Sequence, residues 1–219
     1  KPIFLLDGFD PGDTRNTTAI YQLLGYGTTG QNLGDIVRAQ GYDVIVLNFP
    51  NYTRPSTTTV IDGGVDYIQR NAMILVELIN QINAQKVGTA QNVVIGPSMG
   101  GLISMYALCE YPTIFGKAAC LSTHWPGVFH VANNPIPKAF YRYLSENLPN
   151  HKNHKIYFDF GTETLDAVYE PLQNEIDKIM LKKGYDATNW MTRKFEGENH
   201  SELAWQKRLD IPFVFLFGK

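Results

Sequence analysis

The segment that decides the fold is residues 93–102, with the sequence VVIGPSMGGL. Its β-branched start predicts a short buried strand, and residues 102–110 predict the helix that follows. A strand that turns into a helix within a few residues strains the backbone at the turn, and small neighbours two positions away relieve the crowding. Gly96 and Gly100 occupy those positions. Ser98 is therefore expected at the tip of a sharp turn, with its hydroxyl clear of the sheet.

Strand and helix segments alternate along the chain. Apolar runs bounded by turn formers predict strands at residues 3–6, 44–47, 93–95, 117–121, 155–160 and 190–195. Helical spacing of apolar residues predicts helices at residues 32–40, 67–86, 102–110, 137–148, 166–183 and 201–217. This alternation is typical of an α/β protein with a mostly parallel sheet and helices on both faces. The run at 44–47 is apolar throughout, which predicts a strand buried on both faces.

Size and composition limit the classes of partner. Residues 1–219 are expected to form one domain, in which residues 125–148 are long enough for a small cap. The 19 Lys+Arg and 21 Asp+Glu supply no basic field for nucleic acid. The chain has no run of about eighteen apolar residues, so no membrane span is expected and the protein is predicted to be soluble. No leader with a cleavage site is visible, which leaves secretion and a periplasmic location open.

The cysteines do not indicate a disulfide framework or a metal site. Cys109 and Cys120 are the two present, and their positions show no metal-ligand spacing. No cofactor and no metal are predicted, and the expected partner is a small molecule.

An activated serine needs a base and an orienting acid from later loops at the same edge of the sheet. His200 is best placed as the base, because it lies between the last predicted strand and the last predicted helix. Three carboxylates compete for the role of the acid. Asp166 is preferred, since it lies far enough past the strand at 155–160 to turn back, although it could instead cap a helix. Glu163 is the runner-up, and Asp159 falls inside the strand.

Two backbone N–H groups and three side chains complete the expected site. The N–H of Met99, at the start of the predicted helix, can stabilise an oxyanion, and Phe9 N–H follows the first strand as the second donor. His124, Trp125 and Phe129 fall in a loop expected near the serine and are predicted to bind substrate. The apolar and aromatic residues in the loops expected near the serine favour an acyl or aryl ester, with packing in the core as the alternative for each; they are Phe9, Tyr26, Trp125 and Phe129.

Three segments carry a resemblance to known enzymes. They are IGPSMGGL at residues 95–102, FDFGTETLDA at residues 158–167 and GENHSELAW at residues 197–205. With them, residues 92–219 resemble the putative-esterase branch of the α/β-hydrolases, which includes enterochelin-esterase-like and feruloyl-esterase-like enzymes. The resemblance implies that Ser98, His200 and Asp166 are the catalytic residues.

The first part of the chain resembles a different branch. Its segments are GFDP at residues 8–11, GYDV at residues 41–44 and YIQRNA at residues 67–72. On these segments, residues 1–90 look more like lipase-like α/β-hydrolases. Both resemblances imply the α/β-hydrolase fold, and they differ in the substrate that they imply.

The sequence therefore predicts a serine carboxylic ester hydrolase. His200 takes the proton from Ser98 as Oγ attacks the ester carbonyl, Met99 and Phe9 N–H groups hold the oxyanion, and water releases the acyl group. Two alternatives stay open. One is an acyltransferase that uses the same intermediate, and the other is a catalytically silent binding protein with this fold.

Overall fold

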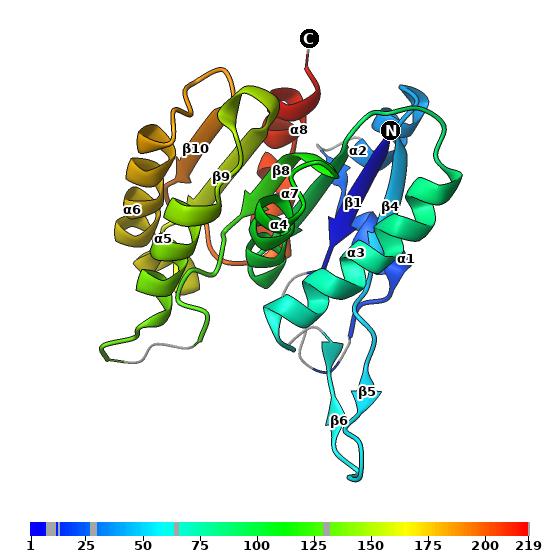
Figure 1. Cartoon of the computed structure of the whole chain (residues 1–219), viewed down its shortest axis with the longest axis horizontal. Coiled ribbons are helices and arrows are strands. Elements are labelled where there is room, and N and C mark those ends of the chain that lie inside the picture. Colours follow the sequence, from blue (N-terminus) through cyan, green and yellow to red (C-terminus); the bar gives the residue numbers. More distant parts are fainter. Residues whose placement is uncertain (8–11, 13, 27–29, 64–65, 129–131, 219) are drawn as a thin grey trace.

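The computed structural model describes residues 1–219 apart from 8–11, 13, 27–29, 64–65, 129–131 and 219. At its centre lies a parallel sheet of six strands in the order β10-β9-β8-β7-β1-β4 (Figure 1). The strands are β1 (Pro2–Leu6), β4 (Asp43–Leu47), β7 (Asn92–Pro97), β8 (Phe115–Leu121), β9 (Lys155–Gly161) and β10 (Trp190–Phe195). The chain moves outward from β1 to β4 and then returns to the other side of β1. The carboxyl ends of β1 and β7 therefore flank a topological switch point, where sheets of this kind bind ligands.

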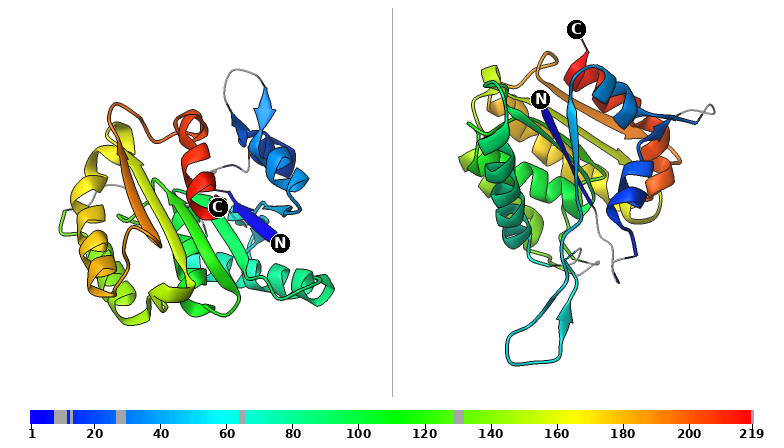
Figure 2. Two further views of the ribbon diagram at one scale, coloured as in Figure 1. Left: turned by 90° about the horizontal axis from the view of Figure 1, so that it is seen from above. Right: turned by 90° about the vertical axis from the view of Figure 1, so that its right-hand side faces the viewer.

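Helices cover both faces of the sheet (Figure 2). One layer holds α3 (Ile68–Gln85), α4 (Met99–Glu110), α5 (Ile136–Asn147) and α6 (Tyr169–Lys182). The other layer holds α1 (Thr17–Gln22), α2 (Leu33–Ala39), α7 (Glu202–Arg208) and α8 (Asp210–Phe217). Successive residues of a strand point to opposite faces of the sheet. Phe4 therefore packs in the core under the first layer of helices, and Ile3 and Leu5 pack in the core under the second. The predicted fold class is confirmed by this architecture.

Shorter elements surround this frame. They are the ribbon of β2 (Gly25–Tyr26) and β3 (Gln31–Asn32), the hairpin of β5 (Tyr52–Thr53) and β6 (Val60–Ile61), and the 3-10 turns η2 (His151–Asn153) and η3 (Thr164–Val168). The β5–β6 hairpin projects away from the body of the molecule (Figures 1 and 2). Within the predicted cap segment, α5 packs against α4 and α6. No helix in the described part of the chain is long and apolar enough to cross a membrane.

Two predictions about single elements are wrong. The strand at 44–47 was expected to be buried on both faces, but β4 lies at the edge of the sheet and most of its residues are partly exposed. The predicted closing helix is two helices that meet at Leu209. Pro212 lacks the N–H that would donate to the carbonyl of Arg208, so α7 cannot continue through it.

Candidate active site

Ser98 lies at the turn between β7 and α4, where the sequence places it. Its φ of 53° and ψ of −117° put a residue with a side chain in the left-handed region of φ, which is strained. The strain is held by neighbouring backbone, because Ser98 N donates to Leu121 O at 2.8 Å and Gly101 N donates to Ser98 O at 3.1 Å. The side chain does not cap α4, which leaves the hydroxyl available for other partners.

Glycines make this turn possible by allowing three backbones to meet. A Cβ on Gly96 would lie 2.6 Å from the backbone of Gly100, and one on Gly100 would lie 2.8 Å from Asp7 O. A Cβ on Gly101 would lie 2.7 Å from Thr123 Oγ1. The start of α4 therefore sits tightly against the ends of β1 and β8. Met99 N–H lies in the first turn of this helix, where amides have no intrahelical partner and the dipole favours negative charge.

His200 and Asp166 form a close pair at the same edge of the sheet. His200 Nδ1 lies 2.6 Å from Asp166 Oδ1, and the two side chains are 9% and 0% exposed. Asp166 Oδ2 also accepts Gly161 N–H at 2.6 Å. The carboxylate thus does not cap a helix, and α6 begins after Val168 without a side-chain cap. Of the three candidate acids, Asp166 is the one that contacts His200, since Glu163 is exposed and Asp159 is paired elsewhere.

Ser98 and His200 are brought to one region, with His124 between the loops that carry them. His124 N–H donates to Ser98 O at 3.2 Å, and the His124 ring lies 6.4 Å from the His200 ring, measured between centroids. Among the hydrogen bonds of the described residues, none joins Ser98 Oγ to His200. Hydrogen bonds between a nucleophile and its base are often long without substrate and tighten in the complex.

The predicted binding residues have different surroundings. Trp125 is 1% exposed, packs against Phe158 in the core and donates its indole N–H to Gln173 Oε1 at 2.8 Å. It therefore offers almost no surface to a substrate, which matches the packing alternative. His124 is also buried, and its Nδ1 hydrogen-bonds with Tyr169. Phe129 and the predicted oxyanion donor Phe9 lie outside the described residues.

The pKa of His124 reflects its burial. Loss of solvent, followed by the proximity of His200, lowers its pKa from 6.5 to about 4. A neutral imidazole at position 124 adds no positive charge beside His200 near neutral pH.

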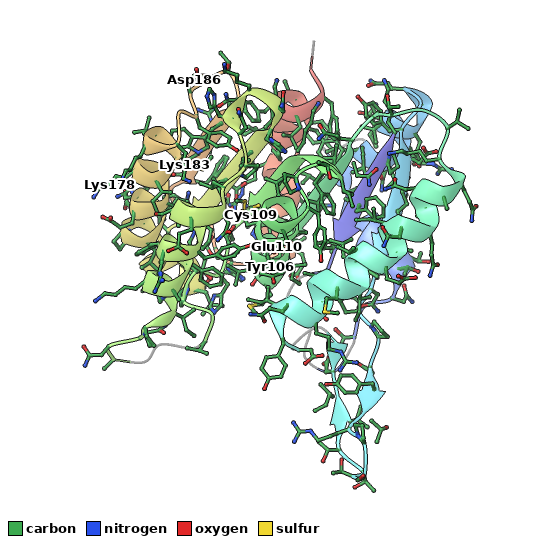
Figure 3. The ribbon with its side chains drawn as sticks, in the orientation of Figure 1. Tyr106, Cys109, Glu110, Lys178, Lys183 and Asp186 are labelled. Carbon is green, nitrogen blue, oxygen red and sulfur yellow. The ribbon has the colours of Figure 1, made fainter. Side chains whose placement is uncertain are left out.

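The cysteines do not compete with Ser98 as nucleophiles. Cys109 and Cys120 are free and buried, and Figure 3 shows Cys109 on α4 near Glu110 and Tyr106. Burial, with the nearby Glu110, raises the pKa of Cys109 to about 12, which keeps it a thiol. Within the described ranges, no three His, Cys, Asp or Glu side chains gather as a metal site would require.

A buried cluster beside Asp166 was missed at the sequence level. Ser122 directly follows β8, and its hydroxyl donates to Asp166 Oδ2 at 2.5 Å. Ser122 Oγ also accepts the indole N–H of Trp205 at 2.8 Å and Nη2–H of Arg208 at 3.0 Å. Arg208 in turn pairs with Asp159 at 2.9 Å. The available signal was the charge of Asp159 inside an otherwise apolar strand, because a buried charge requires a partner.

A groove lies beside Met99, the residue that follows Ser98. It has a volume of about 580 Å³ and is lined by Met99, by Gly127, by the β5–β6 hairpin, by the first residues of α3 and by Tyr67, which precedes α3. A larger hollow of about 740 Å³ lies around Lys117 and Lys155, at the opposite edge of the sheet, and contains none of the predicted site residues. Met99, the residue after Ser98, is among the residues that line the first groove.

Comparisons with known proteins agree with the fold. A family model described as alpha/beta hydrolase fold matches residues 28–207. No curated protein matches the chain by sequence. A structure described as a predicted CIB-like hydrolase from Thermoplasma acidophilum is similar with a TM-score of 0.62 and 14% identity, over 99% of this chain and 87% of that chain.

Two solved esterases are similar to the same degree. For a ferulic acid esterase the TM-score is 0.63 at 15% identity, over 98% of this chain and 84% of that chain. For the enterobactin esterase from Shigella flexneri it is 0.61 at 14% identity, over 99% of this chain and 52% of that chain. At such identities the likeness shows a shared fold.

Proposed function

Since the chain belongs to the alpha/beta hydrolase fold family, we propose that it is a serine hydrolase of carboxylic esters. The observation that carries the proposal is the strained turn at Ser98 together with the buried His200–Asp166 pair at the same sheet edge. The esterases among the structural neighbours support it.

The proposed reaction has two steps. In the first, Ser98 Oγ attacks the ester carbonyl while His200 Nε2 takes the hydroxyl proton, and Asp166 stabilises the imidazolium through Nδ1–H. His200 then gives that proton to the leaving alcohol, which leaves an acyl group on Ser98. In the second step, water attacks the acyl group while His200 takes a proton from the water, and His200 gives this proton to Ser98 Oγ as the acid is released.

Backbone N–H groups supply the oxyanion hole in this proposal. Met99 N–H is the first donor, because it lies at the start of α4 directly after the nucleophile. Phe9 N–H is the second, in the loop after β1, whose first residue, Asp7, lies against Gly100. Loss of one such donor typically lowers kcat about 10²- to 10³-fold.

We assign the groove beside Met99 to the substrate. Its walls include Tyr67, which is 76% exposed, and Val60, which is 64% exposed. These exposed apolar side chains favour contact with apolar groups of a ligand. The same groove is also lined by the charged residues Arg54, Asp62 and Asp66. In this proposal Phe129 contacts the substrate, and His124 and Trp125 support the wall from within.

A fluorophosphonate probe and a pair of serine variants test the function. The probe is expected to label Ser98, and Ser98→Ala is expected to lower kcat for p-nitrophenyl acetate by about 10⁴-fold or more. Ser104→Ala is the matched control, since Ser104 is a buried serine of α4 whose hydroxyl donates to Gly100 O within the helix. Absence of label on Ser98, or full hydrolysis by Ser98→Ala, would refute the proposal. Products formed with added alcohol would separate hydrolysis from acyl transfer.

A further inference from the structure

We propose that Ser122 is a positioning residue of this site, whose hydroxyl proton is directed onto Asp166 because Trp205 and Arg208 occupy its acceptor positions. The inference rests on the proposed function, in which Asp166 orients His200. It assigns a role to a side chain whose hydrogen bonds, among the described residues, go to neither Ser98 nor His200.

Three groups surround the Ser122 oxygen at hydrogen-bonding distance. A serine hydroxyl has one proton to donate and two lone pairs that accept. Trp205 Nε1 and Arg208 Nη2 are groups that only donate, and they lie 2.8 Å and 3.0 Å from Ser122 Oγ. Both lone pairs are therefore in use. The remaining contact of this oxygen, at 2.5 Å, is with Asp166 Oδ2, so the hydroxyl proton points there.

The two oxygens of Asp166 have different partners. Its Oδ2 receives the Ser122 hydroxyl at 2.5 Å and Gly161 N–H at 2.6 Å, and an amide N–H also can only donate. A proton on Oδ2 would have no acceptor to bind. Oδ1 is the oxygen that faces His200 Nδ1, at 2.6 Å. The arrangement keeps Asp166 as an acceptor, so that Nδ1 carries its proton and Nε2 keeps the lone pair that a base needs.

A neutral hydroxyl, that of Ser122, separates Arg208 from Asp166. Arg208 is 3% exposed, and its charge is matched by Asp159, with Nη2–Oδ1 at 2.9 Å and Nε–Oδ2 at 3.3 Å. A direct pair between Arg208 and Asp166 would weaken the attraction of Asp166 for an imidazolium at His200. Ser122 transmits the orientation of the guanidinium without bringing its charge into contact with Asp166.

The backbone at Ser122 provides independent support. Its φ is 41°, in the region that glycine adopts without strain and that costs other residues about 1 kcal/mol. The residue is also fully buried, at 0% exposed. Backbone geometry alone therefore favours glycine here, and the side chain is the part of Ser122 that the network uses.

Ser122→Gly tests this inference, because it relieves the backbone and removes only the hydroxymethyl group. We expect kcat for p-nitrophenyl acetate to fall about 10- to 100-fold with little change in KM, since the Asp166 carboxylate would lose one of the two donors that orient its Oδ2. Ser104→Ala, which removes another fully buried serine hydroxyl, is expected to stay within about twofold of the parent chain. Full kcat in folded Ser122→Gly would overturn the inference.

A proton NMR signal gives a readout that does not depend on activity. The low-field resonance of His200 Nδ1–H, assigned by its absence in His200→Gln, is expected in the parent chain and in Ser104→Ala. In Ser122→Gly it should shift or broaden. If Ser122→Gly does not fold, Trp205→Phe keeps a ring beside His200 and removes the indole N–H, and it should move the same signal less.

The outcomes separate this inference from the proposed function. An unmoved signal in Ser122→Gly, or in Trp205→Phe where the first variant does not fold, overturns the role of Ser122 even if the chain hydrolyses esters. A moved signal in a chain that hydrolyses no ester and is not labelled at Ser98 refutes the proposed function and leaves the positioning of Asp166 in place.

Discussion

The two sides of the carboxyl edge of the sheet are built in opposite ways. On the side of β8, β9 and α7, Asp159, Asp166 and Arg208 are each 3% exposed or less, and hydrogen bonds through Ser122 and within the Arg208–Asp159 pair connect them. On the side of the β5–β6 hairpin, the strands are two residues long, and Tyr67 is 76% exposed. One side is dry and crosslinked by charge-assisted hydrogen bonds, and the other is open to solvent.

We expect the two sides to have different roles in the reaction. Groups that must hold a proton in one place need neighbours that fix their orientation, because a small displacement of a catalytic group lowers the rate of the reaction. Groups that only contact a substrate can stand on loosely packed segments, where binding residues are commonly found. Changes on the network side are therefore expected to affect every ester, whereas changes on the hairpin side are expected to affect some esters more than others.

The largest effect is expected from Asp166→Asn. An asparagine of equal size cannot stabilise the imidazolium and favours the wrong tautomer of His200, so kcat is predicted to fall about 10⁴-fold for all esters. Glu163→Gln removes the neighbouring exposed carboxylate and is expected to change kcat less than twofold. Steady-state kinetics with short and long acyl esters checks both. The reverse order of effects would assign the acid to Glu163.

The second largest effect is expected on the free energy of unfolding. Arg208→Met leaves Asp159 buried without its countercharge, which is expected to lower the free energy of unfolding by about 3–5 kcal/mol. Arg142→Met is the matched control, because its pair with Glu146 is exposed and is worth about 0.5 kcal/mol or less.

Urea unfolding of the two arginine variants measures the difference. Adding Asp159→Asn to Arg208→Met should recover part of the loss, since the uncompensated charge is then gone. Equal losses in the two single variants would show that the network side is not crosslinked as described.

The sequence predicts most of the frame because the relevant signals are local. The turn at Ser98 is encoded by glycines within two residues of it, and α3 follows from apolar spacing within one segment. The β5–β6 hairpin escaped prediction because strands of two residues have no periodicity to detect. The edge position of β4 depends on sheet order, which no single segment carries.

The site is less predictable from the sequence, because it depends on contacts that no single segment encodes. Asp166 and Glu163 are three residues apart, and the turn η3 between β9 and α6 decides which carboxylate reaches His200. Ser122 and Arg208 are 86 positions apart in the chain, and they meet only because α7 packs beneath the end of β8. A serine after one strand and an arginine in a distant helix give no joint signal until the tertiary structure is known.

The stability of the chain is expected to depend on pH through His124, with an effect smaller than that of Arg208→Met. The pKa of His124 is lowered by burial to about 4 in the folded chain, against 6.5 in the unfolded chain. The unfolded state therefore takes up the proton first, and stability is lost as the pH falls from about 6.5 towards 4, by roughly 2–3 kcal/mol. Urea unfolding at pH 7 and at pH 4.5 measures how much stability is lost on acidification. We expect this loss to be about 2–3 kcal/mol smaller in His124→Gln than in the parent chain. An unchanged difference between the two pH values would mean that His124 does not contribute to acid sensitivity.

The smallest effect, and the one that tests the open side, is expected from Tyr67→Ala. Tyr67 lines the groove beside Met99 and has no side-chain capping bond, so its loss should leave stability within about 0.5 kcal/mol of the parent chain. It removes apolar contact from the groove, and kcat/KM is expected to fall several-fold, by about 1 kcal/mol, for bulky esters and little for acetyl esters.

Met73→Ala provides the matched comparison for Tyr67→Ala. Met73 is 67% exposed on the same helix, α3, and does not line the groove. It should leave the ratio of kcat/KM between bulky and acetyl esters unchanged. If Tyr67→Ala lowers kcat/KM equally for every ester, the hairpin side acts on the chemistry itself, and the division between the two sides does not hold. If neither variant changes the ratio, the substrate lies elsewhere along the edge, and the groove loses its assigned role.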